Sequence, residues 1–373
     1  MPQLSHTRRR RGSSRPSQLR GAPARDSAAR TPAGTAPAAL RHERATVLAL
    51  IERGARRLRR AGVFFGHGTD NARDDAAALV LHALGLPHTG ERAIHARRVG
   101  ASGIQRVEEL ISRRIRERIP AVYLTGETWF AGLPFHVDRR VLIPRSPIAE
   151  LIERRFAPWI DARRVRDILD VGTGSGCIAI ACAKALPRAR VDALDISPEA
   201  LEVAALNVRR HRVGKRVRLI RSDHFSALAD ERYDIIVANP PYVGRREMSG
   251  LPPEYGHEPR LALAAGRDGL DSVRVILREA GGRLRPGGLL VVEVGNTEAA
   301  VRRAFPRLPF LWLEFERGGG GVFLLAHEAL DPGSCPAQRG GGQKRGFCPP
   351  PPPPAAAGHV PVPGKSRGRK ATG

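Results

Sequence analysis

Ile168-Leu169-Asp170-Val171-Gly172-Thr173-Gly174-Ser175-Gly176 is the stretch of this chain that decides its fold. It starts as an apolar run typical of a buried parallel strand and ends in a glycine-rich turn. Residues 177–184 (CIAIACAK) continue as an apolar helix. Glycines in such a turn allow positive φ and let a ligand approach the backbone closely. A strand, a glycine turn and a helix in this order predict an α/β fold with a Rossmann-like sheet.

Two further predicted strands end in carboxylates. Residues 191–194 precede Asp195, which is suited to accept hydrogen bonds from both ribose hydroxyls. Residues 217–220 lead to Asp223, whose carboxylate can accept from an adenine amino group. The glycine spacing is G-x-G-x-G and not the dinucleotide G-x-G-x-x-G. Together these strand ends predict a nucleoside site, and the spacing favours S-adenosylmethionine as the cofactor.

A fourth apolar run, residues 233–238, ends at Asn239-Pro240-Pro241-Tyr242. Two prolines cannot continue a central strand, so the chain must leave the sheet at its carboxyl edge, where open α/β sheets bind ligands. The carboxamide oxygen of Asn239 and the carbonyl of Pro240 can each accept one N–H bond from a planar NH2 group. The alternative is a purely structural turn, because Asn-Pro often opens one.

Composition limits the class of protein. The 373 residues suffice for two modest domains, and the formal net charge is +25. Residues 1–40 carry eight Arg and one acid, and residues 331–373 carry seven basic residues and one acid, so the centre keeps +12. A basic centre suits a polyanionic neighbour such as ribosomal RNA, but an arginine-biased proteome explains it nearly as well.

Four cysteines in a chain of this length indicate a reducing compartment. Cys177 and Cys182 are expected in the core, and no Cys/His spacing suggests a metal. The amino terminus lacks the apolar segment of a secretory signal, and no run reaches the length of a membrane span. We therefore expect a cytoplasmic protein.

The pattern along the chain predicts five segments. They are a disordered Arg/Ala/Pro-rich region at 1–41, a helical domain at 42–120, a β-hairpin linker at 121–147, an α/β domain at 148–330 and a disordered Pro/Gly-rich tail at 331–373. Strands are expected near residues 166, 190, 216, 234, 288, 309 and 321.

The tetrapeptide at 239–242 looks like the NPPY signature of methyltransferases that modify amide or exocyclic amino nitrogens. Further matching stretches are GHGTDN at 66–71, PRSP at 144–147, HEP at 257–259, LALAAG at 261–266 and DGL at 268–270. From about 44 to 330 the chain resembles the protein glutamine methyltransferases. Within that group it is most similar to the branch that modifies large-subunit ribosomal protein L-three, because the release-factor branch reads PRPDTE where this chain has PRSPIAE.

The resemblance implies a class I methyltransferase domain with a seven-stranded, mostly parallel sheet, preceded by a small helical domain. It also implies S-adenosylmethionine as methyl donor without a metal, and ribosomal protein L-three as partner, with ribosomal RNA nearby. The implied cofactor contacts are Asp170, Gly172, Thr173, Gly174, Ser175, Gly176, Asp195, Asp223, His224 and Asn239. At His224 the release-factor branch has tryptophan, so a stacking role for this side chain is an open question.

The implied catalytic residues are Asn239, Pro240 and Tyr242, with Pro241 fixing the turn. Arg145 and Glu258 are expected to shape the substrate side, the alternative being an exposed surface ion pair. His67 can contact substrate, but a loop histidine is more often structural or solvated.

Three other functions stay open. The first is a glutamine methyltransferase that acts on release factors. The second is a nucleic-acid methyltransferase acting on the amino group of adenine, which uses the same grip but needs a base-flipping pocket. The third is a ribosome-assembly factor without enzymatic activity, which the intact cofactor motifs disfavour.

Overall fold

The described chain begins with a group of packed helices, α1 (Val47–Arg60), α2 (Ala72–Leu84), α3 (Arg92–Ala96), α4 (Ala101–Glu117) and α5 (Ala121–Thr125). The structure, a computed structural model, describes residues 45–88 and 92–330; the predictions for 1–41 and 331–373 lie outside the described residues. Helix α1 buries Val47, Leu50, Ile51 and Leu58, a helical spacing that places one apolar stripe against its neighbours.

A two-stranded hairpin follows, made of β1 (Glu127–Phe130) and β2 (Leu133–His136). Its two-residue turn has positive φ at Ala131 and Gly132, as the tightest hairpin turns require. The side chain of Asn207, in α8 (Pro198–His211), accepts from the backbone N–H of His136 and donates to its carbonyl, at 2.8 and 2.9 Å. These two bonds attach the hairpin to the α/β domain.

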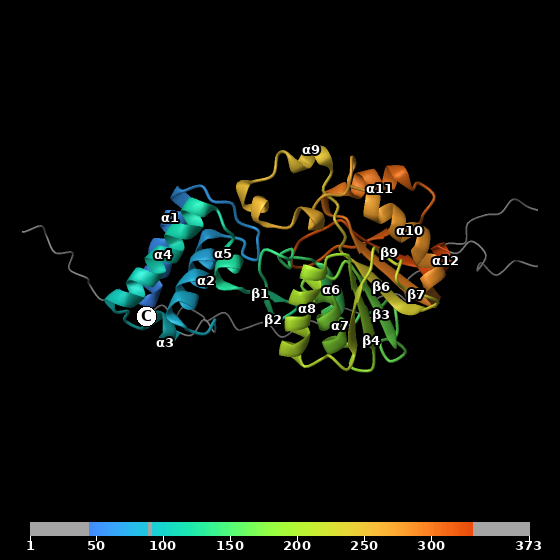
Figure 1. Cartoon of the computed structure of the whole chain (residues 1–373), viewed down its shortest axis with the longest axis horizontal. Coiled ribbons are helices and arrows are strands. Elements are labelled where there is room, and N and C mark those ends of the chain that lie inside the picture. The colour runs from blue at the N-terminus through green and yellow to red at the C-terminus, as the bar shows by residue number, and fades with distance from the viewer. Residues whose placement is uncertain (1–44, 89–91, 331–373) are drawn as a thin grey trace, which may run out of the picture. The chain divides into compact units, whose positions relative to one another are not determined.

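The main sheet has seven strands in the order β5-β4-β3-β6-β7-β9-β8 (Figure 1). Strands β3 to β7 run parallel, and β9 pairs antiparallel with both β7 and β8. The strand bounds are β3 Asp167–Val171, β4 Arg190–Asp195, β5 Val217–Arg221, β6 Tyr233–Ala238, β7 Leu284–Glu293, β8 Leu311–Trp312 and β9 Val322–Ala326. The predicted seven-stranded, mostly parallel sheet and the helical amino-terminal domain are both confirmed.

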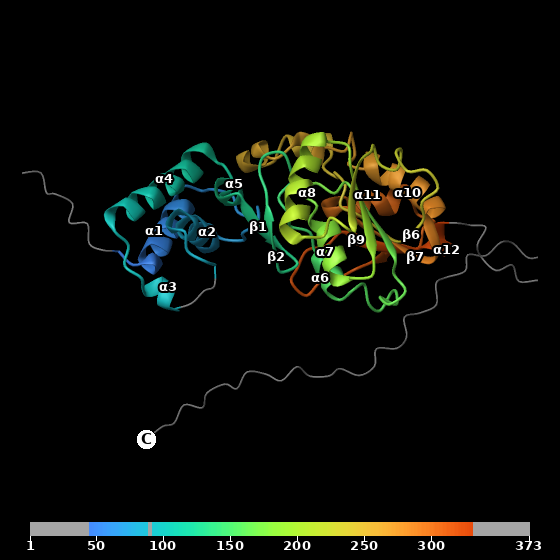
Figure 2. The ribbon, with the colours of Figure 1, turned by 60° about the horizontal axis from the view of Figure 1, so that its bottom comes forward.

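Helices cover both faces of this sheet (Figure 2). On one face α6 (Ile148–Glu153), α7 (Cys177–Ala185) and α8 share a core with alternate strand residues such as Ile168 and Val191. On the other face α10 (Asp271–Arg283) and α11 (Glu298–Ala304) pack on the intervening residues, among them Leu169 and Ile236. Apolar residues that face both sides explain why the strands read as continuous apolar runs. Cys177 and Cys182 are buried in the first core, as predicted.

A long connection between β6 and α10 lies beyond the carboxyl edge of the sheet. It contains α9 (Arg245–Met248) and two 3-10 turns, η1 (Pro253–His257) and η2 (Arg260–Ala262). The remaining short elements are η3 (Gly295–Thr297) and α12 (His327–Leu330). Because β3, β4, β5 and β6 are parallel, their carboxyl ends meet at the same edge, and the connection covers part of it.

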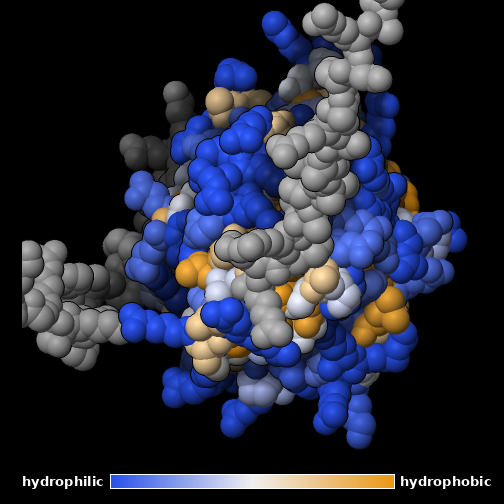
Figure 3. Space-filling model, turned by 90° about the vertical axis from the view of Figure 1, so that its left-hand side faces the viewer, coloured by the Kyte–Doolittle hydropathy of each residue, from blue (hydrophilic) through white to orange (hydrophobic). Residues whose placement is uncertain are grey.

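Within residues 45–88 and 92–330, no helix is both long and apolar enough to cross a bilayer. Outside the grey atoms, the face drawn in Figure 3 is mostly hydrophilic, with apolar residues in small groups.

Candidate active site

The glycine turn after β3 is open on its ligand side. Gly172, Gly174 and Gly176 have φ of +78°, +54° and +79°, a region that favours glycine. A Cβ at Gly172 or Gly174 would meet nothing within 4 Å, whereas one at Gly176 would lie 3.2 Å from Ala204. The first two glycines therefore leave room for a ligand against the backbone, and the third permits close packing with α8.

Asp170 stabilises this turn from the buried side. Its side chain is fully buried, and Oδ2 accepts from the Thr173 hydroxyl at 2.6 Å and from the Ala179 N–H at 3.1 Å. Burial raises the pKa of Asp170 to about 7, partly offset by these two hydrogen bonds. Asp170 thus shapes the turn from a position behind the cavity lining.

A cavity of about 450 Å³ opens at the carboxyl edge of the sheet. Of the predicted cofactor contacts, it is lined by Gly172, Gly174, Asp195, Asp223, His224 and Asn239. Asp170, Thr173, Ser175 and Gly176 do not line it; Thr173 and Ser175 are buried in the turn. The cavity walls combine apolar side chains with a few polar groups, as is usual for small-molecule sites.

Asp195 is fixed by the backbone on both sides. Its Oδ2 accepts from the Gly174 N–H at 2.8 Å, and its Oδ1 accepts from the Ser197 N–H at 2.9 Å. Each carboxylate oxygen can accept a second bond, so acceptor capacity remains for a diol. Burial raises the pKa of Asp195.

At the end of β5 the Asp223 carboxylate lies 2.7 Å from Nδ1 of His224. His224 has φ of +48°, and both residues line the cavity. The two side chains therefore form a polar pair at the cavity wall.

Asn239 follows β6 directly, and Pro240 and Pro241 line the cavity with it. Its side-chain oxygen, Oδ1, is buried and has no hydrogen-bond partner among the described residues. A buried acceptor without a partner costs about 1–3 kcal/mol, so such atoms are rare unless a ligand or water completes them. Asn239 thus presents an acceptor for which the described residues provide no donor.

Tyr242, Arg145 and Glu258 lie outside the cavity lining and belong to a second group of side chains. Arg145 donates to Glu258 through both terminal guanidinium nitrogens, Nη1 and Nη2, with Nη2 to Oε2 at 2.8 Å. Glu258 has no exposed side-chain surface, so the alternative of an exposed surface ion pair is wrong. Burial opposes the charge on Arg145, but the bonds to Glu258 outweigh it and raise the pKa.

His67 joins the second group from the loop between α1 and α2. It is 2% exposed, its ring centre lies 4.4 Å from that of Tyr255, and Nε2 is 4.0 Å from Oε2 of Glu258. Of the two expectations for a loop histidine, the solvated one is wrong, and the buried ring agrees with the structural one. Burial lowers the pKa of His67 to about 4, so the ring is neutral at neutral pH.

Glu293 is a polar residue of this region that the sequence reasoning missed. It is the last residue of β7 and 5% exposed, and burial raises its pKa to about 7 against the opposing effects of Ser146, Arg145 and Tyr242. The available signal was an acidic residue at the end of an apolar strand, the same signal that identified Asp195.

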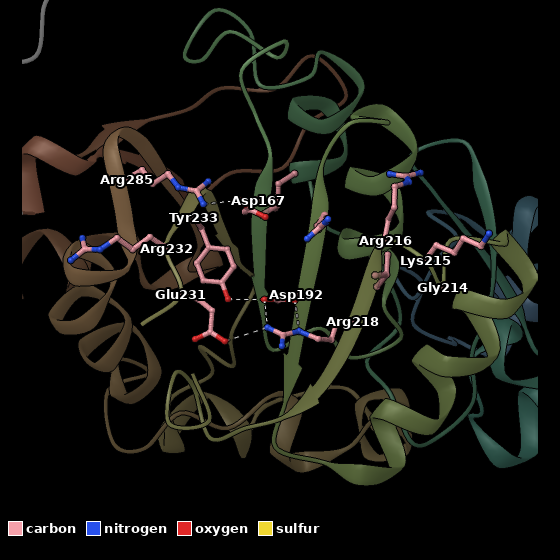
Figure 4. A pocket seen from close by; sticks show the side chains of 13 residues that line it. Asp167, Asp192, Gly214, Lys215, Arg216, Arg218, Glu231, Arg232, Tyr233 and Arg285 are labelled. Carbon is pink, nitrogen blue, oxygen red and sulfur yellow. Dashed lines mark hydrogen bonds and ion pairs between the residues drawn. The ribbon is translucent and has the colours of Figure 1, made fainter. Parts of the chain in front are cut away.

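A larger cavity, about 640 Å³, lies at the amino ends of the strands and contains none of the predicted site residues. Figure 4 shows Arg218 between Asp192 and Glu231, with the Tyr233 hydroxyl donating to Asp192 at 2.8 Å. Arg285 bridges Asp167 and Asp234 at 2.7 and 3.0 Å. The lining of this cavity is therefore dominated by charged side chains.

Comparison with known proteins agrees with this geometry. The methyltransferase small domain family matches residues 154–250, and the PrmC N-terminal domain family matches residues 49–126. The chain is 49% identical over 298 residues to the ribosomal protein uL3 glutamine methyltransferase of Xanthomonas campestris pv. campestris, covering 78% of this chain and 96% of that protein. It is also 49% identical over 292 residues to the enzyme of the same name from Bordetella pertussis, covering 78% of this chain and 98% of that protein.

Proposed function

The chain belongs to the family of ribosomal protein uL3 glutamine methyltransferases, and from this membership we propose that it transfers a methyl group from S-adenosylmethionine to the side-chain amide nitrogen of a glutamine in uL3 (ribosomal protein L-three). It is a methyltransferase by fold and by family. Action on a ribosomal protein implies a cytoplasmic location.

The observation that carries the proposal is the buried, partnerless Oδ1 of Asn239 at the edge of the 450 Å³ cavity. A primary amide offers two N–H groups, and the Asn239 oxygen and the Pro240 carbonyl accept one each. With both bonds fixed, the nitrogen faces the cavity in a single orientation. This matters because the nitrogen lone pair of an amide is delocalised into the carbonyl, so catalysis depends on positioning and on preorganised acceptors.

The cavity residues fit the donor. Gly172 and Gly174 leave open space beside the backbone, and Asp195 keeps acceptor capacity for the ribose hydroxyls. Asp223 and His224 line the part of the cavity that we assign to the adenine ring. When bound, S-adenosylmethionine supplies an electrophilic methyl group on a sulfonium. Asp170, Thr173, Ser175 and Gly176 hold the turn that these contacts need.

Substrate recognition falls to the second group. Tyr242 covers the amide plane, and the Arg145–Glu258 pair lies close enough for its charges to act on the Tyr242 hydroxyl. His67 connects the helical domain to the same group through Glu258 and Tyr255.

We also propose that the protein contacts ribosomal RNA that lies near its protein substrate. Support comes from the amino-edge cavity, where six cationic side chains (Arg190, Lys215, Arg216, Arg218, Arg232 and Arg285) outnumber three carboxylates (Asp167, Asp192 and Glu231). Phosphate contacts depend steeply on salt, so replacing Arg190, Lys215 and Arg232 together should weaken RNA binding and flatten its salt dependence.

The proposed function is tested by offering isotopically labelled methyl donor with purified uL3, a release factor, RNA or DNA, and locating the label by mass spectrometry. Label on a glutamine of uL3 supports the proposal. Label only on release factor or on adenine favours the other activities, and no transfer to any substrate would favour an assembly role.

A further inference from the structure

Glu293 lies next to Asn239 across two paired strands. The parallel pairing of β6 and β7 ends with Ala238 opposite Val292; Asn239 is the first residue after β6, and Glu293 is the last residue of β7. Both therefore lie at the carboxyl edge of the sheet, where Asn239 lines the 450 Å³ cavity and Glu293 lies outside its lining.

The two residues share an uncommon property. Among the described residues, Oδ1 of Asn239 and Oε2 of Glu293 are both buried and without a hydrogen-bond partner. Two oxygens on neighbouring residues, each without a donor among the described residues, point to a ligand that brings N–H groups.

The backbone holds Glu293 in place. The Val294 N–H donates to the Gly321 carbonyl at 2.7 Å. A Cβ at Gly321 would lie 2.1 Å from the Gly295 carbonyl oxygen, so the backbone after β7 packs closely against the backbone before β9. On the site side, the Ser146 and Tyr242 hydroxyls interact with the Glu293 carboxyl as hydrogen-bond donors and Arg145 interacts with it through its charge, and all three oppose the rise of its pKa. Tyr242 belongs to the same tetrapeptide as Asn239.

We propose that Glu293 is a further catalytic residue, which shares one of the two substrate N–H groups with the Asn239–Pro240 pair in a three-centre hydrogen bond and takes up that proton on methyl transfer. This rests on the proposed function. The nitrogen–methyl bond forms as the carbon–sulfur bond of the donor breaks, with its electron pair left on sulfur. One N–H bond of the amide then breaks, its electrons return to nitrogen, and the proton passes to the Glu293 carboxylate. A carboxylate beside the nitrogen also stabilises the positive charge that develops there.

The proton must later leave Glu293, which a group that titrates near neutral pH does readily. Only the ionised form can accept the proton. The rate of methyl transfer should therefore increase with pH up to about 7 and then level off, which is the sign expected for a base.

The test uses the full chain with uL3 in single-turnover assays between about pH 5.5 and about pH 9, a range that spans the titration of the carboxyl. Glu293→Gln should reduce the rate at pH 8 about a hundredfold, the lower end of the usual contribution of acid–base groups, and should remove the pH dependence. Glu293→Asp should be slower than wild type but keep the pH dependence. Cofactor affinity and melting temperature are measured for each variant.

Glu254→Gln is the matched control, because Glu254 is also a buried glutamate with one oxygen that lacks a partner among the described residues, but lies beside Arg114 and Arg118. It should reduce stability and leave the pH profile unchanged. A Glu293→Gln variant with the wild-type rate and pH profile would contradict the proposed role of Glu293 but not the proposed function. A loss of rate that is fully explained by weaker cofactor binding or by a lower melting temperature would do the same. A wild-type enzyme that methylates no glutamine would overturn the proposed function as well.

Discussion

Arg114 and Glu254 form an ion pair across 140 residues of sequence, with Nη1 and Oε1 3.2 Å apart and both side chains fully buried. Arg114 lies in α4 of the helical domain, and Glu254 lies in the connection that follows the Asn-Pro-Pro-Tyr turn. The same guanidinium also binds Asp75 at 2.9 Å. The helical domain thus holds the segment that carries Tyr255 and Glu258.

Arg114→Met should therefore lower the free energy of unfolding by about 3–5 kcal/mol, because it leaves the buried Asp75 without its cation and removes the nearer of the two cations beside the buried Glu254. Chemical denaturation measures this. Arg116→Met is the control, since Arg116 is 68% exposed and should change stability by less than about 0.5 kcal/mol. Equal effects of the two substitutions would mean that the buried pair does not hold the segment.

The buried His67 predicts a specific pH dependence of stability. Its pKa is about 4 in the folded chain and 6.5 when unperturbed, so the unfolded chain binds a proton first as pH falls. The folded state therefore loses up to about 3 kcal/mol relative to the unfolded state between about pH 6.5 and about pH 4, and loses nothing above about pH 7.

His67→Leu should remove this loss, since both ring nitrogens lack hydrogen-bond partners among the described residues. The variant should be near wild type at pH 7.5 and more stable than wild type at pH 5, as measured by denaturant titration at both values. A variant that is less stable than wild type by the same amount at both pH values would show that the neutral ring stabilises the fold through polar contacts.

Gly295 determines where Tyr242 can lie. Its φ is +46°, and a Cβ at this position would be 2.6 Å from Cε2 of Tyr242. Gly295→Ala should displace the ring and slow methyl transfer by up to about a hundredfold, with cofactor affinity unchanged.

The matched control is Gly287→Ala. Gly287 also has positive φ, +75°, but a Cβ there would meet nothing within 4 Å. Both variants should lose about 1 kcal/mol of stability from backbone strain, and only the first should lose activity. If the two lose activity equally, the position of Tyr242 is not what limits transfer.

The sheet could be predicted because its strands are buried on both faces, and continuous apolar runs between glycine, proline and acidic residues define them. The carboxyl-edge site followed from the same logic, since Asp195, Asp223 and Asn239 each lie at or within a few residues of the end of such a run and all line the cavity. Which residues of the glycine turn face the cavity was not predictable, because Gly172 and Gly176 have the same local signature but different neighbours.

The burial of ion pairs between residues far apart in the sequence could not be predicted either. Arg145 and Glu258 are 113 residues apart, so nothing local distinguishes a buried pair from an exposed one. The connection between β6 and α10 carries Glu258 back to the loop before α6, and His67 reaches the same place from the helical domain. Glu293 was missed although it ends an apolar strand as Asp195 does, because no glycine or proline follows it directly: Val294 comes next and Gly295 only after that.

The central claim is that Asn239 binds the substrate amide, and Asn239→Ala tests it most directly. Single-turnover methyl transfer to uL3 and cofactor affinity by calorimetry are measured on the same preparation. We expect transfer to fall roughly a hundred- to a thousandfold, as when one preorganised contact at a reacting centre is removed, with nearly unchanged cofactor affinity. Near-normal methyl transfer by the alanine variant would contradict the proposed hydrogen bond between the substrate amide and Asn239. It would also contradict the assignment of the amide nitrogen as the methylated atom.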